Sequence, residues 1–153
     1  MKKKILSLGT AFLIAVGVGL HPVVVSANTN NSELMFEENL LRTEGLISVY
    51  SLYISNSNGD LSITATTRSN SIMSTIGLKN ISVQRSSDGI SWTEESTITD
   101  KLKNNSTIYS LNGFKKSVVG NNNYYRVQLN HYADNGSGTT QTESNTSNVI
   151  RIS

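Results

Sequence analysis

The stretch Leu78–Thr97 has a pattern that strongly favours an antiparallel β-hairpin. Ile81 and Val83 alternate with polar residues before Ser86–Gly89, and the same two-residue period resumes beyond it as far as Trp92. A period of two places successive side chains on opposite faces of a strand. Serine, aspartate and glycine between two such runs supply the chemistry of a tight turn. The rest of the chain is expected to form further strands against this hairpin.

Two residues of the hairpin carry specific predictions. Gly89 stands where a type I turn needs a left-handed backbone, so a Cβ there would be strained. We expect this turn to close a loop of three to five residues. Trp92, the only tryptophan, shares the phase of Ile90. Because large aromatic rings dominate core packing, we expect Trp92 to pack inward or over the stem of a neighbouring strand.

Several other runs have the same β character, and clusters of asparagine, glycine, serine and aspartate separate them. Ser69–Met73 is expected to be a short polar link. No proline follows Pro22, so no run is disqualified as a strand. The pattern predicts an all-β fold, a single antiparallel β-sandwich of about seven strands of immunoglobulin-like or fibronectin III-like kind. Besides the hairpin, the candidate strands are Leu46–Ile54, Asp60–Arg68, Ser106–Leu111, Tyr124–Ala133 and Val149–Ile152.

The longest alternating run is Tyr124–Ala133, which follows a crossover rich in glycine and asparagine. Tyr125 stands where an immunoglobulin-like strand F carries its corner tyrosine. The cysteine pair and the strand C tryptophan of true immunoglobulin domains are absent. The sandwich architecture is therefore predicted, and the strand topology is left open.

The N-terminal residues 1–27 are expected to be a cleaved signal peptide. Three lysines at 2–4 precede the apolar run Ile5–Leu20, and small residues end the segment. The apolar run is shorter than the roughly 20 residues that span a bilayer. Cleavage is expected between Ala27 and Asn28. The protein should then be secreted, with no membrane insertion after removal of the signal.

Residues 28–44 are expected to form a leader that is disordered or contains one short N-terminal helix. Ser32–Arg42 has a serine that could cap a helix and a weak apolar stripe, but it spans only about three turns, a marginal length. The alternative is an irregular lead-in to the first strand. Residues 45–153 are expected to form the single β-sandwich domain, and the chain that remains after removal of residues 1–27 is long enough to support one core.

Charge and cysteine content exclude several classes. Without the three lysines of the signal, the 13 basic residues fall to ten, against 11 acidic residues. No basic cluster remains that would favour nucleic acid, so no nucleic-acid partner is expected. The chain has no cysteine, which excludes disulfides and thiolate metal sites.

Candidate catalytic residues are few. His131 is the only histidine beyond the signal, and it falls in phase with buried positions of its strand, so a Ser-His-Asp arrangement is not expected. Glu94 and Glu95 are neighbours on one strand and should point to opposite faces, which argues against a paired-carboxylate hydrolase. We expect no enzyme activity and no catalytic residue.

Aspartates beside glycine or asparagine could donate oxygens to calcium. Asp60, Asp88 and Asp134 lie in such turns, but no D-x-D-x-D spacing is present. Aspartate is common in turns because its carboxylate bonds nearby backbone groups. We therefore expect turn residues, with no metal and no cofactor.

Binding is the remaining functional option. If Tyr125 faces the core, the outer face of its strand carries a mixed aromatic and polar set that could hold a glycan or another protein at the cell surface. Gln84 and Arg85 would lie nearby if the hairpin pairs with this strand. The alternatives are an ordinary polar sheet face and a secreted toxin, bacteriocin or signalling factor. The predicted binding face consists of Tyr124, Arg126, Gln128 and Tyr132.

Three segments, Ile76–Thr93, Tyr109–Gly113 and Tyr124–Gly138, resemble an uncharacterised family of small secreted β-sandwich proteins from Gram-positive bacteria. The resemblance covers most of Leu46–Ile152, and its motifs are structural. It implies a signal peptide, an extracellular location and an immunoglobulin-like or fibronectin III-like fold. It implies no activity, cofactor or catalytic residue.

Overall fold

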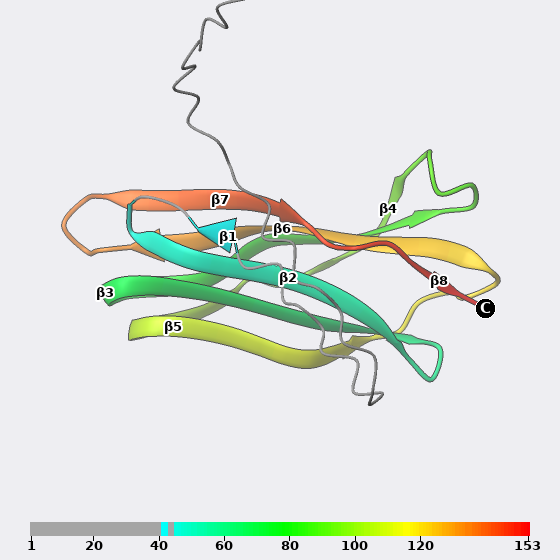
Figure 1. Ribbon diagram of the computed structural model, residues 1–153, viewed down its shortest axis with the longest axis horizontal. Helices are drawn as coiled ribbons and strands as arrows, with labels where there is room; N and C mark the ends of the chain where they lie inside the picture. Colours follow the sequence, from blue (N-terminus) through cyan, green and yellow to red (C-terminus); the bar gives the residue numbers. More distant parts are fainter. Residues whose placement is uncertain (1–40, 43–44) are drawn as a thin grey trace, which may run out of the picture. The chain divides into compact units, whose positions relative to one another are not determined.

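The regular structure of the chain is entirely β in the residues that can be described. A computed structural model describes residues 41–42 and 45–153, which confirms the all-β prediction. The signal peptide, its cleavage site and most of the leader lie outside the described residues. The strands pair antiparallel (Figure 1) and are β1 (Leu41–Arg42), β2 (Ile47–Ser57), β3 (Asp60–Ser86), β4 (Thr93–Ile98), β5 (Lys101–Lys116), β6 (Asn123–Asp134), β7 (Thr140–Thr146) and β8 (Ile150–Ile152).

One long strand, β3, connects two sections of sheet. Its first part pairs with β2 on one side and with the end of β5 on the other. Its second part pairs with β6 on one side and with β4 and the start of β5 on the other. The register between β3 and β5 shifts between Arg68 and Met73, so the residues expected as a link, 69–73, form an irregular part of one 27-residue strand.

The core lies between these two sections. Burial alternates along β3 and β6 as the two-residue period predicts, and each fully buried aliphatic side chain contributes about 1.5–3 kcal/mol. The second section adds β7 and β8 along β6. This packing is that of a β-sandwich. Its core residues include Leu61, Ile63 and Ala65 from the first section and Leu78, Val83, Tyr125, Val127 and Leu129 from the second.

Two expectations at the strand ends need correction. Leu41 and Arg42, the end of the proposed helix Ser32–Arg42, pair with β2 as a strand; the other residues of that segment are outside the described part. The hairpin loop is also longer than expected, because six residues, 87–92, separate β3 from β4. Gly89 has a φ of +74°, the left-handed conformation that its turn position calls for.

The crossover before β6 is held by a tyrosine hydroxyl. Tyr125 is completely buried, and its hydroxyl oxygen accepts a hydrogen bond from the Gly120 N–H at 3.2 Å. Gly120 is itself buried, so its N–H would otherwise be left without a partner. A bond from the first residues of a strand back to the preceding crossover is the geometry of a tyrosine corner.

We expect Tyr125→Phe to lower the free energy of unfolding by about 1–3 kcal/mol, because it leaves a buried N–H unsatisfied while preserving the ring. Urea unfolding would measure this loss. Tyr132→Phe is the matched control and should change stability by less than about 0.5 kcal/mol. Equal stability of the Tyr125→Phe variant and the unchanged protein would contradict the corner assignment.

Candidate functional site

Polar side chains on the outer face of the second section are hydrogen-bonded in series. The Arg126 Nε–H donates to Gln84 Oε1 at 2.7 Å, and Gln84 Nε2 donates to Gln128 Oε1 at 2.8 Å. Gln128 Nε2 then donates to Thr146 Oγ1 at 3.3 Å. The register places Gln84 beside Arg126 on adjacent strands, and Gln128 opposite Thr146 on β7. We call these four residues the side-chain relay.

Trp92 lies over this relay rather than in the core. The Arg126 guanidinium carbon is 4.4 Å from the centre of the Trp92 ring, the geometry of a cation–π contact. Trp92 therefore packs over a side chain of a neighbouring strand, the second of the two expected arrangements. The expectation that Ile90 continues the inward phase is wrong, because Ile90 is 82 % exposed.

The residues between β3 and β4 form a loop instead of continuing as strand, because the Asp88 side chain binds their backbone. The Asp88 carboxylate accepts hydrogen bonds from the backbone N–H groups of Ile90 and Ser91, each at 2.8 Å, and from the Ser86 hydroxyl at 2.7 Å. The Ser91 and Ile90 N–H groups, together with that hydroxyl, hold the pKa of Asp88 well below its usual range. Asp88 thus shapes the loop that carries Trp92 onto the sheet face.

A polar groove of about 310 Å³ runs beside the relay. It lies where the register between β3 and β6 shifts between Lys79 and Ser82, and Asn80 there has a φ of +52°. Irregularities of this kind re-aim side chains and are common next to binding sites. The groove is lined by Asn80, Ser82, Gln84, Glu94, Gln128, Leu129, Asn130, Ser144, Asn145 and Thr146.

Two further pairs inside the groove hold its lining in place. The Ser82 hydroxyl donates to Glu94 Oε2 at 2.7 Å, and the Ser144 hydroxyl donates to Asn130 Oδ1 at 2.8 Å. Glu94 and Glu95 point to opposite faces, as their adjacency on a strand requires. Glu95 instead forms an ion pair with Arg85, with 3.5 Å between Oε2 and Nε, and its Oε1 accepts a hydrogen bond from the Val119 N–H.

The four residues of the predicted binding face all alternate with buried positions of β6, but they do not form one site. Arg126 and Gln128 meet through Gln84, which the sequence placed nearby. Tyr124 adjoins them and lies 5.5 Å from the Arg151 guanidinium carbon. Tyr132 is eight residues beyond Tyr124 on the same strand, which places it roughly 27 Å away. Its ring instead contacts Lys79, whose Nζ is 3.5 Å from the ring centre.

Several residues in the groove and around it could not be predicted from the sequence. Ser82 and Glu94 carry no motif, and their place in the groove depends on which strands pair. The phase of Ser82 with Gln84 was the available signal, since residues two apart on a strand share a face. Thr146 and Arg151 could not be assigned before the pairing of β7 and β8 with β6 was known.

His131 is completely buried and engaged at both ring nitrogens. The Thr67 hydroxyl donates its one hydrogen to the Gly77 carbonyl at 3.1 Å, so it accepts from His131 Nδ1–H at 2.8 Å. His131 Nε2 then accepts from Asn145 Nδ2 at 3.4 Å. Burial lowers the pKa of His131 from 6.5 to about 4. The ring is a neutral core residue with no surface for a substrate.

Two of the three aspartates considered as calcium ligands, Asp88 and Asp134, accept hydrogen bonds from their own loops, whereas Asp60 is the first residue of β3. Asp134 Oδ1 accepts from the Gly136 N–H at 2.7 Å, as Asp88 does from its loop. In the part of the chain that the structure describes, no three His, Cys, Asp or Glu side chains gather into a metal-binding group. No helix there is long and apolar enough to cross a bilayer.

Comparison with protein-family models, with curated proteins and with solved structures finds no match to this chain. The resemblance to a secreted β-sandwich family therefore stays a prediction. The candidate site rests on the geometry of the groove and the relay alone.

The buried neutral histidine should make stability depend on pH. Between about pH 6.5 and pH 4 the unfolded chain binds a proton that folded His131 does not, so the free energy of unfolding falls as the pH falls. A shift of this size corresponds to about 3 kcal/mol over the window. Urea unfolding from about pH 7.5 to about pH 4.5 would measure the decline.

The contribution of Asp88 is separable, because its lowered pKa means that its stabilising charge is lost only below its usual pKa of 3.8. His131→Gln should flatten the decline between pH 6.5 and pH 4. A decline of the same steepness in that variant would show that other groups cause it.

Proposed function

We propose that the protein is a secreted, non-catalytic binding module that holds a glycan in the groove formed by β4, β3, β6 and β7. The observation that carries this proposal is the side-chain relay beside Trp92. Glycans offer hydroxyl groups that both donate and accept hydrogen bonds, and their ring faces pack on aromatic side chains. The groove supplies amides and hydroxyls, and the Trp92 ring lies on Arg126 beside it.

Pre-organisation supports binding over an ordinary polar surface. Isolated surface amides sample many rotamers, and ordering each side chain on binding costs about 0.5–1.5 kcal/mol. Gln84 and Gln128 are already held by two hydrogen bonds each. Arg126 is held by both Gln84 and the Trp92 ring. A ligand that binds here meets side chains whose conformational entropy has already been lost.

The distribution of titratable groups in the groove supports a non-catalytic role. Glu94 is the single carboxylate among the residues that line the described groove, and its Oε2 accepts a bond from Ser82. Hydrolysis of a glycan needs two carboxyl groups across the scissile bond. His131 is buried on the inner face of β6 and is not available as a base.

An immunoglobulin-like or fibronectin III-like class and secretion belong to the same proposal. The bond between Tyr125 and Gly120 and the two packed sheet sections support the class. The lysines, apolar run and small residues of positions 1–27 support export. A protein displayed outside the cell would meet glycans of its own wall or of a host.

The fluorescence of Trp92 provides a direct binding assay, because it is the only tryptophan in the chain. We expect titration with a panel of wall and host-surface oligosaccharides to give a saturable change for at least one glycan. Gln128→Ala removes two bonds of the relay and should raise Kd by about tenfold. Loss of the amide should leave the fold intact, since Gln128 lies on the outer face.

Asn70→Ala is the matched control, because Asn70 is an exposed amide on β3 outside the groove. It should leave Kd unchanged. The proposal is wrong if no glycan in the panel binds, or if Gln128→Ala and Asn70→Ala bind with the same affinity.

A further inference from the structure

The direction of the relay determines which hydrogen-bonding groups remain for a ligand. Arginine can only donate, so the Arg126 Nε–H bond fixes the Gln84 oxygen toward Arg126 and its amino group toward Gln128. The same reasoning orients Gln128 toward Thr146. Each glutamine oxygen already accepts one bond, while each amino group keeps one N–H and the Thr146 hydroxyl keeps its hydrogen. The relay therefore presents mainly donors.

Arg126 adds charge to this set of donors. Its Nε–H donates to Gln84 and one face of its guanidinium plane is covered by Trp92, but its two terminal nitrogens form no hydrogen bond within residues 45–153. The one ion pair in that part of the chain joins Arg85 to Glu95. Arg126 is thus held in position without a carboxylate partner.

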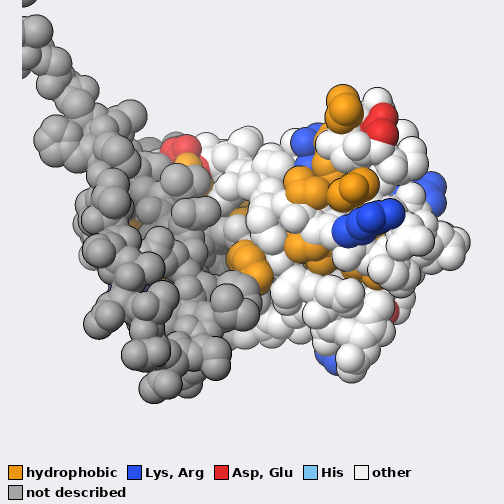
Figure 2. All heavy atoms as spheres, turned by 45° about the vertical axis from the view of Figure 1, so that its right-hand side comes forward, with side chains coloured by type: hydrophobic (Ala, Val, Ile, Leu, Met, Phe, Trp, Pro, Cys, Tyr) orange, Lys and Arg blue, Asp and Glu red, His pale blue; other side chains and the backbone are white. Residues whose placement is uncertain are grey.

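A second arginine repeats the arrangement at the same end of the sheet. Arg151 on β8 lies opposite Tyr124 in the register, its guanidinium carbon is 5.5 Å from the Tyr124 ring, and its Nε donates to the Asn122 carbonyl at 3.2 Å. Arg151 is exposed and likewise lacks an ion pair among the described residues. Figure 2 shows basic and hydrophobic side chains side by side on the face that comes forward there.

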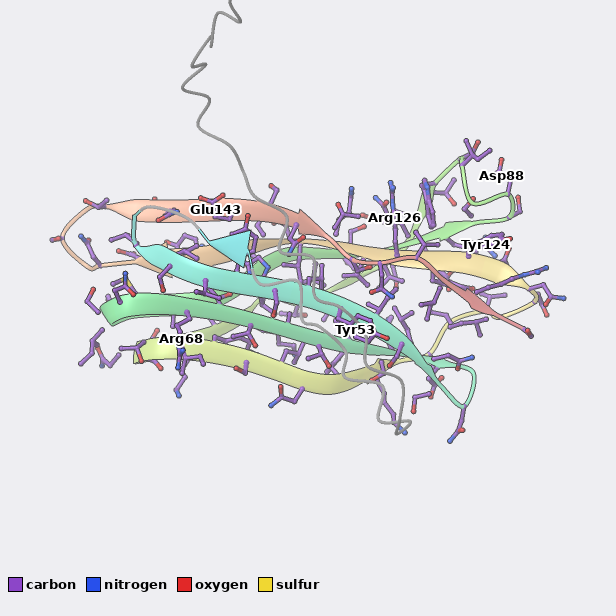
Figure 3. All side chains as sticks on the ribbon, viewed as in Figure 1. Tyr53, Arg68, Asp88, Tyr124, Arg126 and Glu143 are labelled. Atoms are coloured by element: carbon purple, nitrogen blue, oxygen red, sulfur yellow. The ribbon has the colours of Figure 1, made fainter. Side chains whose placement is uncertain are left out.

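The nearby acids form no ion pair with either arginine in the part of the chain that the structure describes. Asp88 is at the same end as Arg126 and Tyr124 (Figure 3), and its charged carboxylate is hydrogen-bonded to the backbone of its own loop. Glu94 lies on the other side of Gln84 from Arg126, because Gln84 pairs with Glu94 on β4 and with Arg126 on β6. Arg126 therefore lies beside the groove, on one side of the lining residue Gln84, and Glu94 lies on the other side.

We infer that the ligand of the groove is an acidic glycan, whose carboxylate or phosphate binds the terminal nitrogens of Arg126 and whose neighbouring acidic group reaches Arg151. This inference rests on the proposed function and names its substrate class. A planar guanidinium held on an aromatic ring presents its two terminal nitrogens to two oxygens of one anion. The spare N–H groups of Gln84 and Gln128 add neutral donors to the sugar oxygens beside it.

Three polymers of related size would test the inference by titration of Trp92 fluorescence. Oligogalacturonate carries one carboxylate per sugar, its methyl ester is the neutral counterpart, and a glycerol phosphate oligomer carries phosphate. We expect oligogalacturonate or the phosphate oligomer to bind at least about tenfold more tightly than the methyl ester, since bonds to charged groups are the stronger ones. Affinity for the acidic polymer should fall in high salt.

Arg126→Gln should weaken binding of the acidic polymer by about tenfold or more, and Arg151→Gln by about two- to fivefold because it is exposed. Arg68→Gln is the matched control, with the same change of charge on an exposed residue at the opposite end of the structure (Figure 3). It should leave affinity unchanged.

The outcomes separate the two proposals. Equal affinity for oligogalacturonate and its methyl ester, with Gln128→Ala still weakening both, overturns the acidic-ligand inference and leaves the glycan proposal standing. An equal effect of Arg126→Gln and Arg68→Gln also overturns it. Failure of all three polymers and of the wider panel to bind overturns the proposed function and this inference together.

Discussion

The backbone pairing of β3 is the interaction on which the rest of the structure depends. This one strand is hydrogen-bonded to β2, β4, β5 and β6, so both sections of the sandwich share it. Because its side chains alternate, the residues that face the core and those that face the groove are set by the same register. A slip of one residue would bury Gln84 and expose Val83. Core and candidate site are therefore specified together.

The relay extends this dependence from backbone to side chains. Adjacent strands place Gln84 between Glu94 and Arg126, and the arginine then dictates the direction of every amide after it. Hydrogen bonds in series polarise one another, so each bond of the relay is stronger than it would be alone. Asp88 contributes from outside the sheet by shaping the loop that lays Trp92 on Arg126. The result is a donor-rich surface with its orientation fixed before a ligand arrives.

Local patterns predicted much of this fold. Alternation identified the buried residues of β6, and the position of Tyr125 after a glycine-rich crossover identified the residue that bonds Gly120. Non-local features were not predictable. Asn112 and Gly113 look like a turn but form a bulge within β5, opposite Thr64. Likewise, Trp92 has the two-residue period of a strand in the sequence, but it lies in a loop because the Asp88 carboxylate binds the loop backbone. Contacts between segments that are distant in the sequence determine these features, and no single segment reveals them.

The central claim is that the relay and Trp92 are the part of the surface that touches a ligand. Side-chain NMR signals of the isotope-labelled protein, recorded during titration with oligogalacturonate, test it most directly. The account predicts that the Arg126 Nε–H, the Gln84 and Gln128 amide and the Trp92 indole signals shift together along one saturable curve. If these signals stay in place while those of β2 or β5 shift, the ligand binds elsewhere and the account is wrong.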